Sequence, residues 1–404
     1  MFTDNQIDKL IQPVIDRQNK IEMFVLGKMA DRLKEIEGLL PSDIRKLEQL
    51  YKTGSDIREI NKELARQSKL QEKRIKKIIR EVAADNYKDA EVFYNYRKRR
   101  YIPFTENIPM QNIVNAIESV TIGAYRNISR STAYSIAWKD ILTGGLIEYL
   151  NLEETYKRLI DIGIQSVTTG IIDYRSAMSQ ILTNLTNSGL NTVTYQAESG
   201  RVIHQRTDSA VRRNLLDGVR AVNQAMQNEI GKQVGADGVE LSVHAMSAPD
   251  HEPIQGHQFT DEEYEKCQTQ QDFVDTYGIY FAAIARPIGV WNCRHFAYNI
   301  ILGVQEPRYT LEQLEEFKEN NARGYTYTDS KGRQKHLTMY ECTQKQRQYE
   351  LSIRKAREGK VLAKKAGSQK DVDKFERLIN DRLQEYTRFS KNCGLKPQYM
   401  RTKM

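Results

Sequence analysis

Apolar residues recur at helical spacing along most of the first 234 residues of the chain. Over 56–83 they follow one another at intervals of three and four, a period that predicts an amphipathic helix. The same spacing predicts helices over 111–135, 151–188 and 207–232. A further helix is expected to open at Pro41, with Ile44, Leu47, Leu50 and Tyr51 on one face.

The pattern changes at Gly235. From there to His244 apolar and polar residues alternate, which predicts a strand that ends at His244. The segment that follows, up to residue 310, is rich in Pro, Gly and aromatic residues. Within it, Thr260 and Glu263 have the spacing of a capping box, which predicts a short helix. Residues 235–310 are therefore expected to form a compact α+β module.

Helical signals return after this module. A helix is expected over 311–322, then a β-hairpin over 324–338. Two long helices follow, the first opening at the capping box of Thr338 and the second at Ser368. The fold class predicted is mainly α with a small central α+β module, a helical N-terminal arm and a C-terminal helical hairpin.

The positions at which these sequence patterns change divide the chain into four expected domains. They are an N-terminal helical arm at 1–105, a central helical domain at 106–234, the small α+β His/Cys module at 235–310, and the C-terminal helical hairpin with its basic tail at 311–404.

Composition narrows the class of protein. The chain has 404 residues, 39% of them hydrophobic and 28% charged, which is typical of a soluble helical protein. No apolar segment reaches the roughly 20 residues that a membrane-spanning helix needs, and the polar start predicts no signal peptide. The four cysteines are widely spaced, which favours synthesis in a reducing compartment rather than a disulfide framework.

The net charge of +8 is unevenly distributed. Residues 51–100 carry a net +7 and residues 301–404 a net +9, whereas residues 101–300 carry a net −7. Such basic flanks suit contact with DNA phosphates or with an acidic partner. The alternative is that the basic stretches at 69–80 and 345–365 are solvated helix faces without a nucleic-acid partner.

Four metal-ligating side chains fall in two pairs: His244 and His251 before the module's acidic stretch, and Cys293 and His295 after it. A third histidine, His257, lies six residues beyond His251. Zinc prefers four thiolate or imidazole ligands in a tetrahedron, and two local pairs brought together by the fold are a usual source of such a set. The four residues therefore predict a structural zinc site.

Two other interpretations of this cluster stay open. The four side chains could be hydrogen-bonded polar residues of the core without a metal. Alternatively, Cys293 could be a nucleophile activated by a histidine, as in a thiol hydrolase, or His251 could be the base of a metal-dependent nuclease. The chain has no phosphate-binding loop, no HExxH and no GxSxG motif, so these chemistries find no further support in the sequence.

Several separated motifs together resemble one known family. They are ESGR at 198–201, AVRRNLLDGV at 210–219, GADGVELSVHAMSAPDHEPIQGHQF at 235–259, GVWNCRHFAYNIILGVQEPRYT at 289–310 and YECTQKQRQYELSIRKAREGK at 340–360. In this order they are similar to the phage minor capsid protein 2 family of tailed phages of Gram-positive bacteria, which looks related to the phage Mu F-like head proteins. The resemblance covers roughly residues 1 to 400.

Within that family pattern, a His, a second His, a Gln-Gly pair and an Asn-Cys-Arg-His run recur. Here they correspond to His244, His251, Gln255-Gly256 and the run that ends at His295. The chain departs from the pattern in lacking an arginine around Ser247-Ala248-Pro249 and in having Ile254 where a tryptophan is usual. The His and Cys residues are retained, which favours a structural role for them.

The resemblance implies a non-enzymatic structural protein of the phage head, made in the bacterial cytoplasm and present in few copies in the virion. It further implies a place near the portal, contacts with the portal and other head proteins, and a part in head assembly or in DNA packaging and ejection. The basic helices would then be candidates for contact with packaged DNA. The rival functions are a nuclease or thiol hydrolase built on the His/Cys cluster, and a stand-alone DNA-binding protein.

Overall fold

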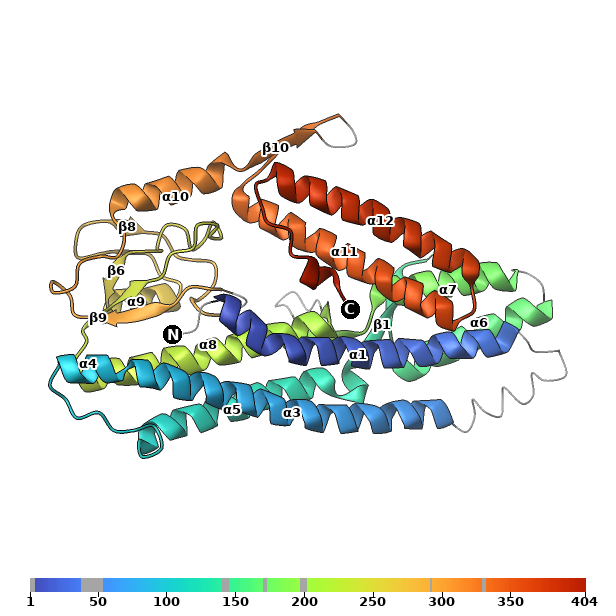
Figure 1. The fold of residues 1–404 in the computed structure, drawn as a ribbon, viewed down its shortest axis with the longest axis horizontal. Helices are drawn as coiled ribbons and strands as arrows, with labels where there is room; N and C mark the ends of the chain where they lie inside the picture. The colour runs from blue at the N-terminus through green and yellow to red at the C-terminus, as the bar shows by residue number, and fades with distance from the viewer. Residues whose placement is uncertain are drawn as a thin grey trace. The chain divides into compact units, whose positions relative to one another are not determined.

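The computed structural model describes residues 4–37, 54–139, 145–169, 173–196, 202–290, 293–328 and 332–404. Figure 1 shows the fold, which is predominantly helical. The helix expected to open at Pro41 lies outside the described residues, so that prediction stays untested. No described helix is long and apolar enough to cross a membrane.

The described α-helices confirm the predicted fold class, mainly α with a small α+β module. They are α1 (Asp4–Glu37), α3 (Ser55–Asp89), α4 (Glu91–Tyr96), α5 (Ile108–Ser129), α6 (Leu152–Thr169), α7 (Tyr174–Ser188), α8 (Thr207–Val234), α9 (Asp261–Gln268), α10 (Leu311–Arg323), α11 (Met339–Lys365) and α12 (Gln369–Asn392).

The chain folds into two compact units, and each unit is built from three separate segments. The first unit contains residues 1–12, 74–122 and 213–345, and the second contains 13–73, 123–212 and 346–404. Residues 235–310, the expected α+β module, all belong to the first unit.

The second unit contains a four-stranded antiparallel sheet that periodicity did not predict. Its strand order is β2-β1-β3-β4, from β1 (Tyr134–Lys139), β2 (Ile147–Asn151), β3 (Asn191–Gln196) and β4 (Val202–Arg206). Tyr134, Ile136 and Trp138 alternate toward the core, which is the period of a strand and not of a helix. The helix predicted over 111–135 is therefore wrong at its end, because α5 stops at Ser129 and β1 follows.

The predicted helix over 151–188 is also wrong as a single element. The structure has two helices there, α6 and α7. The second of these helices begins after Asp173, whose carboxylate accepts a hydrogen bond from Ser176 N and so caps α7. The predicted end near Gly189 is confirmed, since Gly189 is the C-cap of α7.

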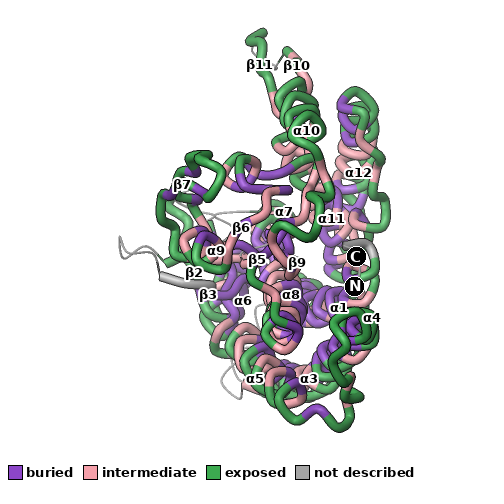
Figure 2. Tube along the Cα trace, turned by 90° about the vertical axis from the view of Figure 1, so that its left-hand side faces the viewer, coloured by how far each residue is buried: buried purple, intermediate pink, exposed green. Residues whose placement is uncertain are grey.

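The core of the second unit lies where β1, the paired helices and the C-terminal hairpin meet. Its buried members come from α1, α3, β1, α6, α7, α11 and α12, among them Leu26, Met29, Trp138, Leu182 and Phe375. Figure 2 shows the alternation of buried and exposed positions along these helices. The apolar faces predicted from the sequence periodicity are thus the faces that pack into the core.

The α+β module of the first unit is built on a three-stranded antiparallel sheet. Its order is β6-β5-β9, from β5 (Gly238–Leu241), β6 (Gln258–Thr260) and β9 (Ala297–Ile300). A small hairpin of β7 (Phe273–Val274) and β8 (Tyr280–Phe281) packs Phe273 and Phe281 against Phe259. The predicted capping box at α9 is confirmed in both of its hydrogen bonds.

The elements expected after residue 310 are also present. Helix α10 is followed by the hairpin of β10 (Tyr325–Thr328) and β11 (Gln334–Leu337), which pair in antiparallel register. Helices α11 and α12 are joined at Gly367 and Ser368, and the Ser368 hydroxyl accepts a hydrogen bond from Asp371 N. The two capping signals at Thr338 and Ser368 thus mark the starts of both helices.

Candidate metal centre

The pairing of β5 with β9 determines where the His/Cys residues meet. Leu241, the last residue of β5, pairs with Ala297, the first residue of β9. Just beyond this pair, Ser242 N donates to Phe296 O at 2.8 Å. The chain that leaves β5 and the chain that enters β9 therefore lie side by side, although some fifty residues separate them in sequence.

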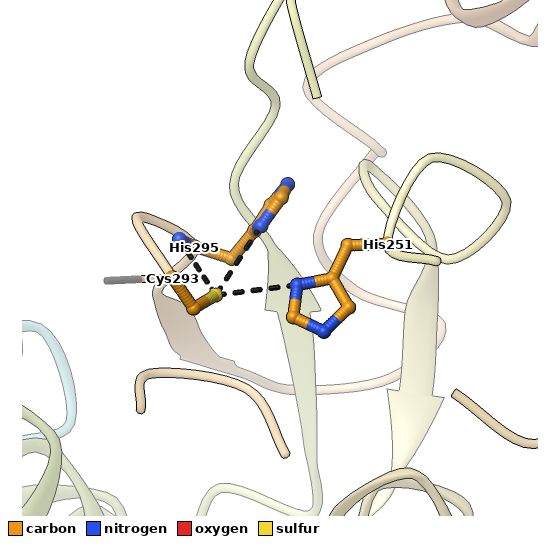
Figure 3. Close-up of side chains that lie close together, drawn as sticks. All are labelled: His251, Cys293 and His295. Carbon is orange, nitrogen blue, oxygen red and sulfur yellow. Dashed lines mark hydrogen bonds between the residues drawn. The ribbon is translucent and has the colours of Figure 1, made fainter. Parts of the chain in front are cut away.

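Three of the four predicted ligands converge at this place. Cys293 Sγ lies 3.3 Å from His251 Nδ1 and 3.5 Å from His295 Nδ1, as Figure 3 shows. All three candidate ligand atoms lie within 4.8 Å of one another. Their residues are buried, with exposed fractions of 2% for Cys293, 0% for His251 and 5% for His295.

Cys293 and His295 reach the cluster from a loop and not from a strand. They precede β9, which begins only at Ala297. Both side chains nevertheless lie in the cluster, and His295 N donates to Cys293 Sγ at 3.4 Å. His251 comes from the loop between β5 and β6. Asn292, which belongs to the run that carries the family resemblance, lies outside the described residues.

The outer nitrogen of each clustered imidazole meets a carbonyl oxygen. His251 Nε2 lies 2.9 Å from the Arg286 carbonyl oxygen, and His295 Nε2 lies 3.2 Å from Gln255 Oε1. The Arg286 carbonyl oxygen only accepts, so it assigns the proton of neutral His251 to Nε2, and the Nδ1 lone pair of that ring is directed at Cys293 Sγ. His295 Nε2 also lies 3.5 Å from Ser247 Oγ, a hydroxyl that can donate to it.

His244, the fourth predicted ligand, lies beside the cluster but points elsewhere. Its ring packs edge-on against that of His295, with centroids 4.7 Å apart. Its Nε2 is 2.7 Å from the Arg294 carbonyl oxygen, and its backbone N–H donates to Gln255 Oε1. The strand β5 ends three residues earlier than the predicted end at His244.

His257 lies apart from the cluster. Its ring packs against the aromatic rings of Phe281 and Phe259, with centroid distances of 5.1 and 6.2 Å. Burial lowers the pKa of this histidine. It is part of the module's aromatic core.

The electrostatics of the cluster follow from burial and close contact. Burial is the largest influence on the pKa of the Cys293 thiol and acts to raise it, but the hydrogen bond and charge of His251 together with backbone hydrogen bonds outweigh burial, so this pKa is lowered. For His251, burial acts to lower the pKa, but the contact with Cys293, the Arg286 carbonyl and the charge of Asp250 together raise it. Burial, together with neighbouring His244 and His251, lowers the pKa of His295 to about 2, so this ring is neutral.

An ion pair holds the loop that faces His251. Arg286 Nε lies 3.0 Å from Asp250 Oδ2, and the carbonyl of Arg286 is the one that meets His251 Nε2. The side chain that precedes His251 therefore fixes the position of that carbonyl, which in turn orients the imidazole.

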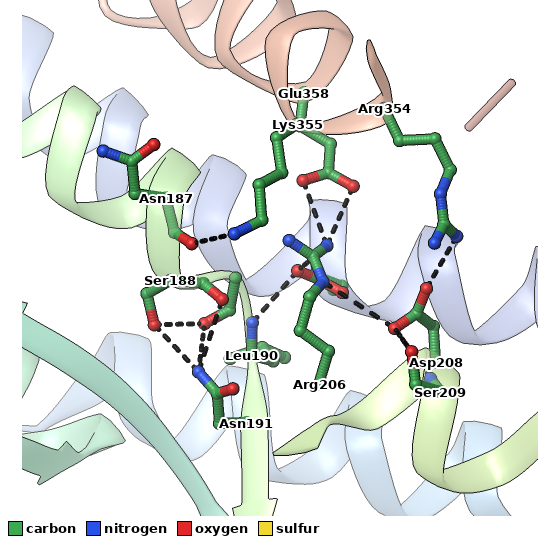
Figure 4. Close-up of polar contacts among 12 residues, drawn as sticks. Asn187, Ser188, Leu190, Asn191, Arg206, Asp208, Ser209, Arg354, Lys355 and Glu358 are labelled. Atoms are coloured by element: carbon green, nitrogen blue, oxygen red, sulfur yellow. Dashed lines mark hydrogen bonds and ion pairs between the residues drawn. The ribbon is translucent and has the colours of Figure 1, made fainter. Parts of the chain in front are cut away.

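The structure also shows a polar site that the sequence did not indicate. In the second unit a buried cluster joins Arg206 to Glu22, Glu358 and Asp208, and Arg354 Nη1 binds Asp208 at 2.6 Å (Figure 4). Its members come from α1, β4, α8 and α11. No spacing in the sequence marks them, because each element contributes only one or two residues.

The basic stretch at 69–80 is partly used in ion pairs within the protein. Lys76 and Arg80 both bind Glu118 of α5, at 3.0 and 2.6 Å, and Lys77 binds Glu81. These three cations are therefore each paired with a carboxylate, although Lys76 and Arg80 share one.

The second basic stretch, 345–365, is engaged in the same way. Arg354 binds Asp208, Lys360 binds Glu376 and Lys365 binds Asp31, at distances of 2.6 to 3.0 Å. Lys355 donates to the Asn187 carbonyl oxygen at 2.5 Å. Much of the charge of this helix therefore serves packing inside the second unit.

A family model supplies the comparison with known proteins. The model described as phage minor capsid protein 2 matches residues 2–389 of the chain. No curated protein and no solved structure matches the chain. The family match spans the His/Cys cluster, the buried charge cluster and both units.

Proposed function

Because the chain belongs to the phage minor capsid protein 2 family, it is a structural protein of the phage head and a component of the virion, and we propose that it acts near the portal vertex. There it would take part in head assembly and in DNA packaging or ejection. We further propose that it contacts the packaged DNA through one face of α3. The observation that carries the DNA contact is a stripe of basic residues on that face.

The basic stripe consists of Lys62, Arg66, Lys69 and Lys73, all exposed on α3. Their spacing of four, three and four residues places them on one side of the helix. Together with Ala65 and Leu70 they line a shallow groove with a volume of about 420 Å³. At 1.5 Å per residue the stripe is roughly 16 Å long, which matches the span of about five phosphates of one DNA strand.

The charges of this stripe are available to a partner. Within the described part of the chain, no carboxylate forms an ion pair with Lys62, Lys69 or Lys73, and only Arg66 has one, with Glu63. The basic residues farther along the helix differ, since Lys76 binds Glu118. A polyanion would therefore find uncompensated charge at the stripe and little elsewhere on α3.

We propose that this role is non-enzymatic. The burial of Cys293 and His251 supports this, because a thiol nucleophile must be reached by its substrate and these side chains are 2% and 0% exposed. The burial disfavours the rival thiol hydrolase and, for the same reason, a nuclease that uses His251 as its base. The helices that flank the module would make the assembly contacts.

The DNA contact is tested by the salt dependence of duplex binding by the full-length protein. The variant K62Q/K69Q/K73Q is expected to lower the slope of log K against log salt by about 2.7, since each phosphate contact contributes about 0.9. A matched control, K391Q/K396Q/K403Q, removes the same charge from exposed residues. Equal slopes for the two variants would refute the assignment to α3.

The place in the head is tested in DNA-filled phage particles. Quantitative mass spectrometry against the major capsid protein is expected to give a low, reproducible copy number. Cross-linking of the same particles is expected to join this chain to the portal protein. Absence from particles, or a copy number like that of the major capsid protein, would contradict the proposal.

A further inference from the structure

We propose that His251 Nδ1, Cys293 Sγ and His295 Nδ1 bind one transition-metal ion, with zinc as the metal that this ligand set favours. The inference goes beyond the role in the phage head and does not depend on it. The module folds around these three atoms in either case, so failure of one proposal leaves the other standing.

The spacing of the three atoms fits a tetrahedral ion. With Zn–S near 2.3 Å and Zn–N near 2.0 Å, two ligands of a tetrahedral zinc lie roughly 3.5 Å apart. The separations of Cys293 Sγ from His251 Nδ1 and His295 Nδ1 are 3.3 and 3.5 Å. Two edges of the tetrahedron are therefore already formed, and only small side-chain movements are needed to close the third.

The hydrogen-bond partners of the cluster leave a place for a cation. When both Nε2 atoms donate to carbonyl oxygens, each Nδ1 of His251 and His295 needs a donor. Cys293 has a single S–H and can satisfy only one of them. A cation bound by the thiolate and by both nitrogen lone pairs satisfies all three atoms.

The partners behind the imidazoles are those that metal-bound histidines usually have. A ligating imidazole donates its second N–H to a carbonyl or carboxylate, which fixes the ring and its tautomer. Here the Arg286 carbonyl serves His251, and Gln255 Oε1 serves His295. Gln255 also accepts from His244 N, so it holds His295 and the chain after β5 together.

His244 is not among the proposed ligands, since its Nε2 is engaged with the Arg294 carbonyl oxygen. We assign His244 to the residues that surround the ligands, because its ring packs against the ring of His295. The fourth position of the ion would be taken by a solvent molecule.

Metal binding would fasten a part of the module that has little regular structure. The residues between β5 and β6 and those just before β9 form turns and loops, with the sheet below them. An ion shared by His251 and by Cys293 with His295 joins these two loops. Folding of the loops and binding of the ion would then be coupled.

The test uses the full-length protein, purified without chelators. Elemental analysis is expected to find about one zinc per chain. Replacement by Co²⁺ is expected to give the visible bands of a tetrahedral site and a thiolate charge-transfer band in the near ultraviolet. C293S and H251Q should lose both signals. C267S, which removes a buried cysteine of the same module, should keep them.

A second measurement covers the case in which C293S fails to fold. In the wild-type protein, addition of a chelator is expected to raise the rate of Cys293 alkylation at least tenfold, with Cys267 as the internal reference. A folded protein that holds no zinc and gives no cobalt bands would overturn the proposal. Equal metal loss in C267S and C293S would overturn the ligand assignment.

Discussion

Arg206 and Glu22, 184 residues apart in the sequence, form a buried contact in which Arg206 Nη2 donates a hydrogen bond to Glu22 Oε1 at 2.8 Å. The same Nη2 binds both oxygens of Glu358, at 2.9 and 3.0 Å. One guanidinium thus joins α1, the end of β4 and α11 within the second unit. The cluster holds together elements from all three segments of that unit.

Loss of the guanidinium should destabilise the second unit strongly. Arg206→Met would leave the buried Glu358 carboxylate without its guanidinium partner, which costs about 3–5 kcal/mol. Urea unfolding followed by circular dichroism measures this loss. Arg66→Met, which breaks an exposed pair with Glu63, is the control and should leave the unfolding midpoint unchanged. Equal midpoints for the two variants would contradict the structural role of the cluster.

Glu22 should make stability fall as pH rises. Burial raises its pKa from 4.5 to about 8; Glu358 and Asp208 act in the same direction, against Arg206. Because the folded state then holds a proton that the unfolded chain has released, this contribution is present below pH 4.5 and is lost as pH rises to about 8. The slope approaches about 1.4 kcal/mol per pH unit.

Unfolding free energies at pH 5, 6, 7 and 8 measure this effect. Glu22→Gln has no titrating group at this position. The difference in unfolding free energy between wild type and variant should therefore change with pH by up to about 1.4 kcal/mol per pH unit. Parallel pH profiles for the two proteins would show that the carboxyl of Glu22 is ionised in the folded state throughout this range.

Gly189 should not tolerate a side chain. Its φ is +64°, and a Cβ would meet the Glu22 carboxylate and the Arg206 guanidinium. Neither the carboxyl group of Glu22 nor the guanidinium of Arg206 can move away at low cost, because the two are hydrogen-bonded to each other in the buried cluster. Gly189→Ala is expected to cost about 2–4 kcal/mol. In contrast, Gly123→Ala in α5 meets no described atom within 4 Å and should stabilise by about 0.5–1 kcal/mol through helix propensity. Thermal unfolding distinguishes the two.

Gly359 should be required for the close approach of α11 and α12. A Cβ at this position would meet the ring of Phe375. Overpacking of about 1–3 kcal/mol then outweighs the helix propensity that alanine adds, so Gly359→Ala should be less stable than wild type. The double variant G359A/F375L should recover part of the loss. Additive effects of the two substitutions in denaturant unfolding would contradict a direct contact.

Periodicity predicted the helices well where an apolar face repeats over several turns. Helices α3, α8, α11 and α12 lie close to their expected bounds, and the capping box of Thr260 and Glu263 marked the start of α9. Periodicity failed at β1. Its buried residues Tyr134, Ile136 and Trp138 follow closely after a helical pattern, and the strand is too short for a period of two to stand out. The bounds of α1 were missed as well, because Pro13 lies inside the helix and interrupts its pattern.

The two polar clusters were predictable to different degrees. The His/Cys group could be found because its residue types are rare in this chain and are common metal ligands. Which of them converge depended on the pairing of β5 with β9, a contact that sequence spacing does not give. Arg206, Glu22 and Glu358 are common residue types, and only the tertiary fold brings them together.

The discontinuous make-up of the two units has a consequence for how the protein is made. The second unit includes residues 346–404, so it cannot be completed until these residues have been synthesised. The first unit needs the chain as far as Lys345. Neither unit can therefore fold in the usual N-terminal-first order. The apolar faces of α1 and α3 stay unburied until partners much later in the sequence have been made.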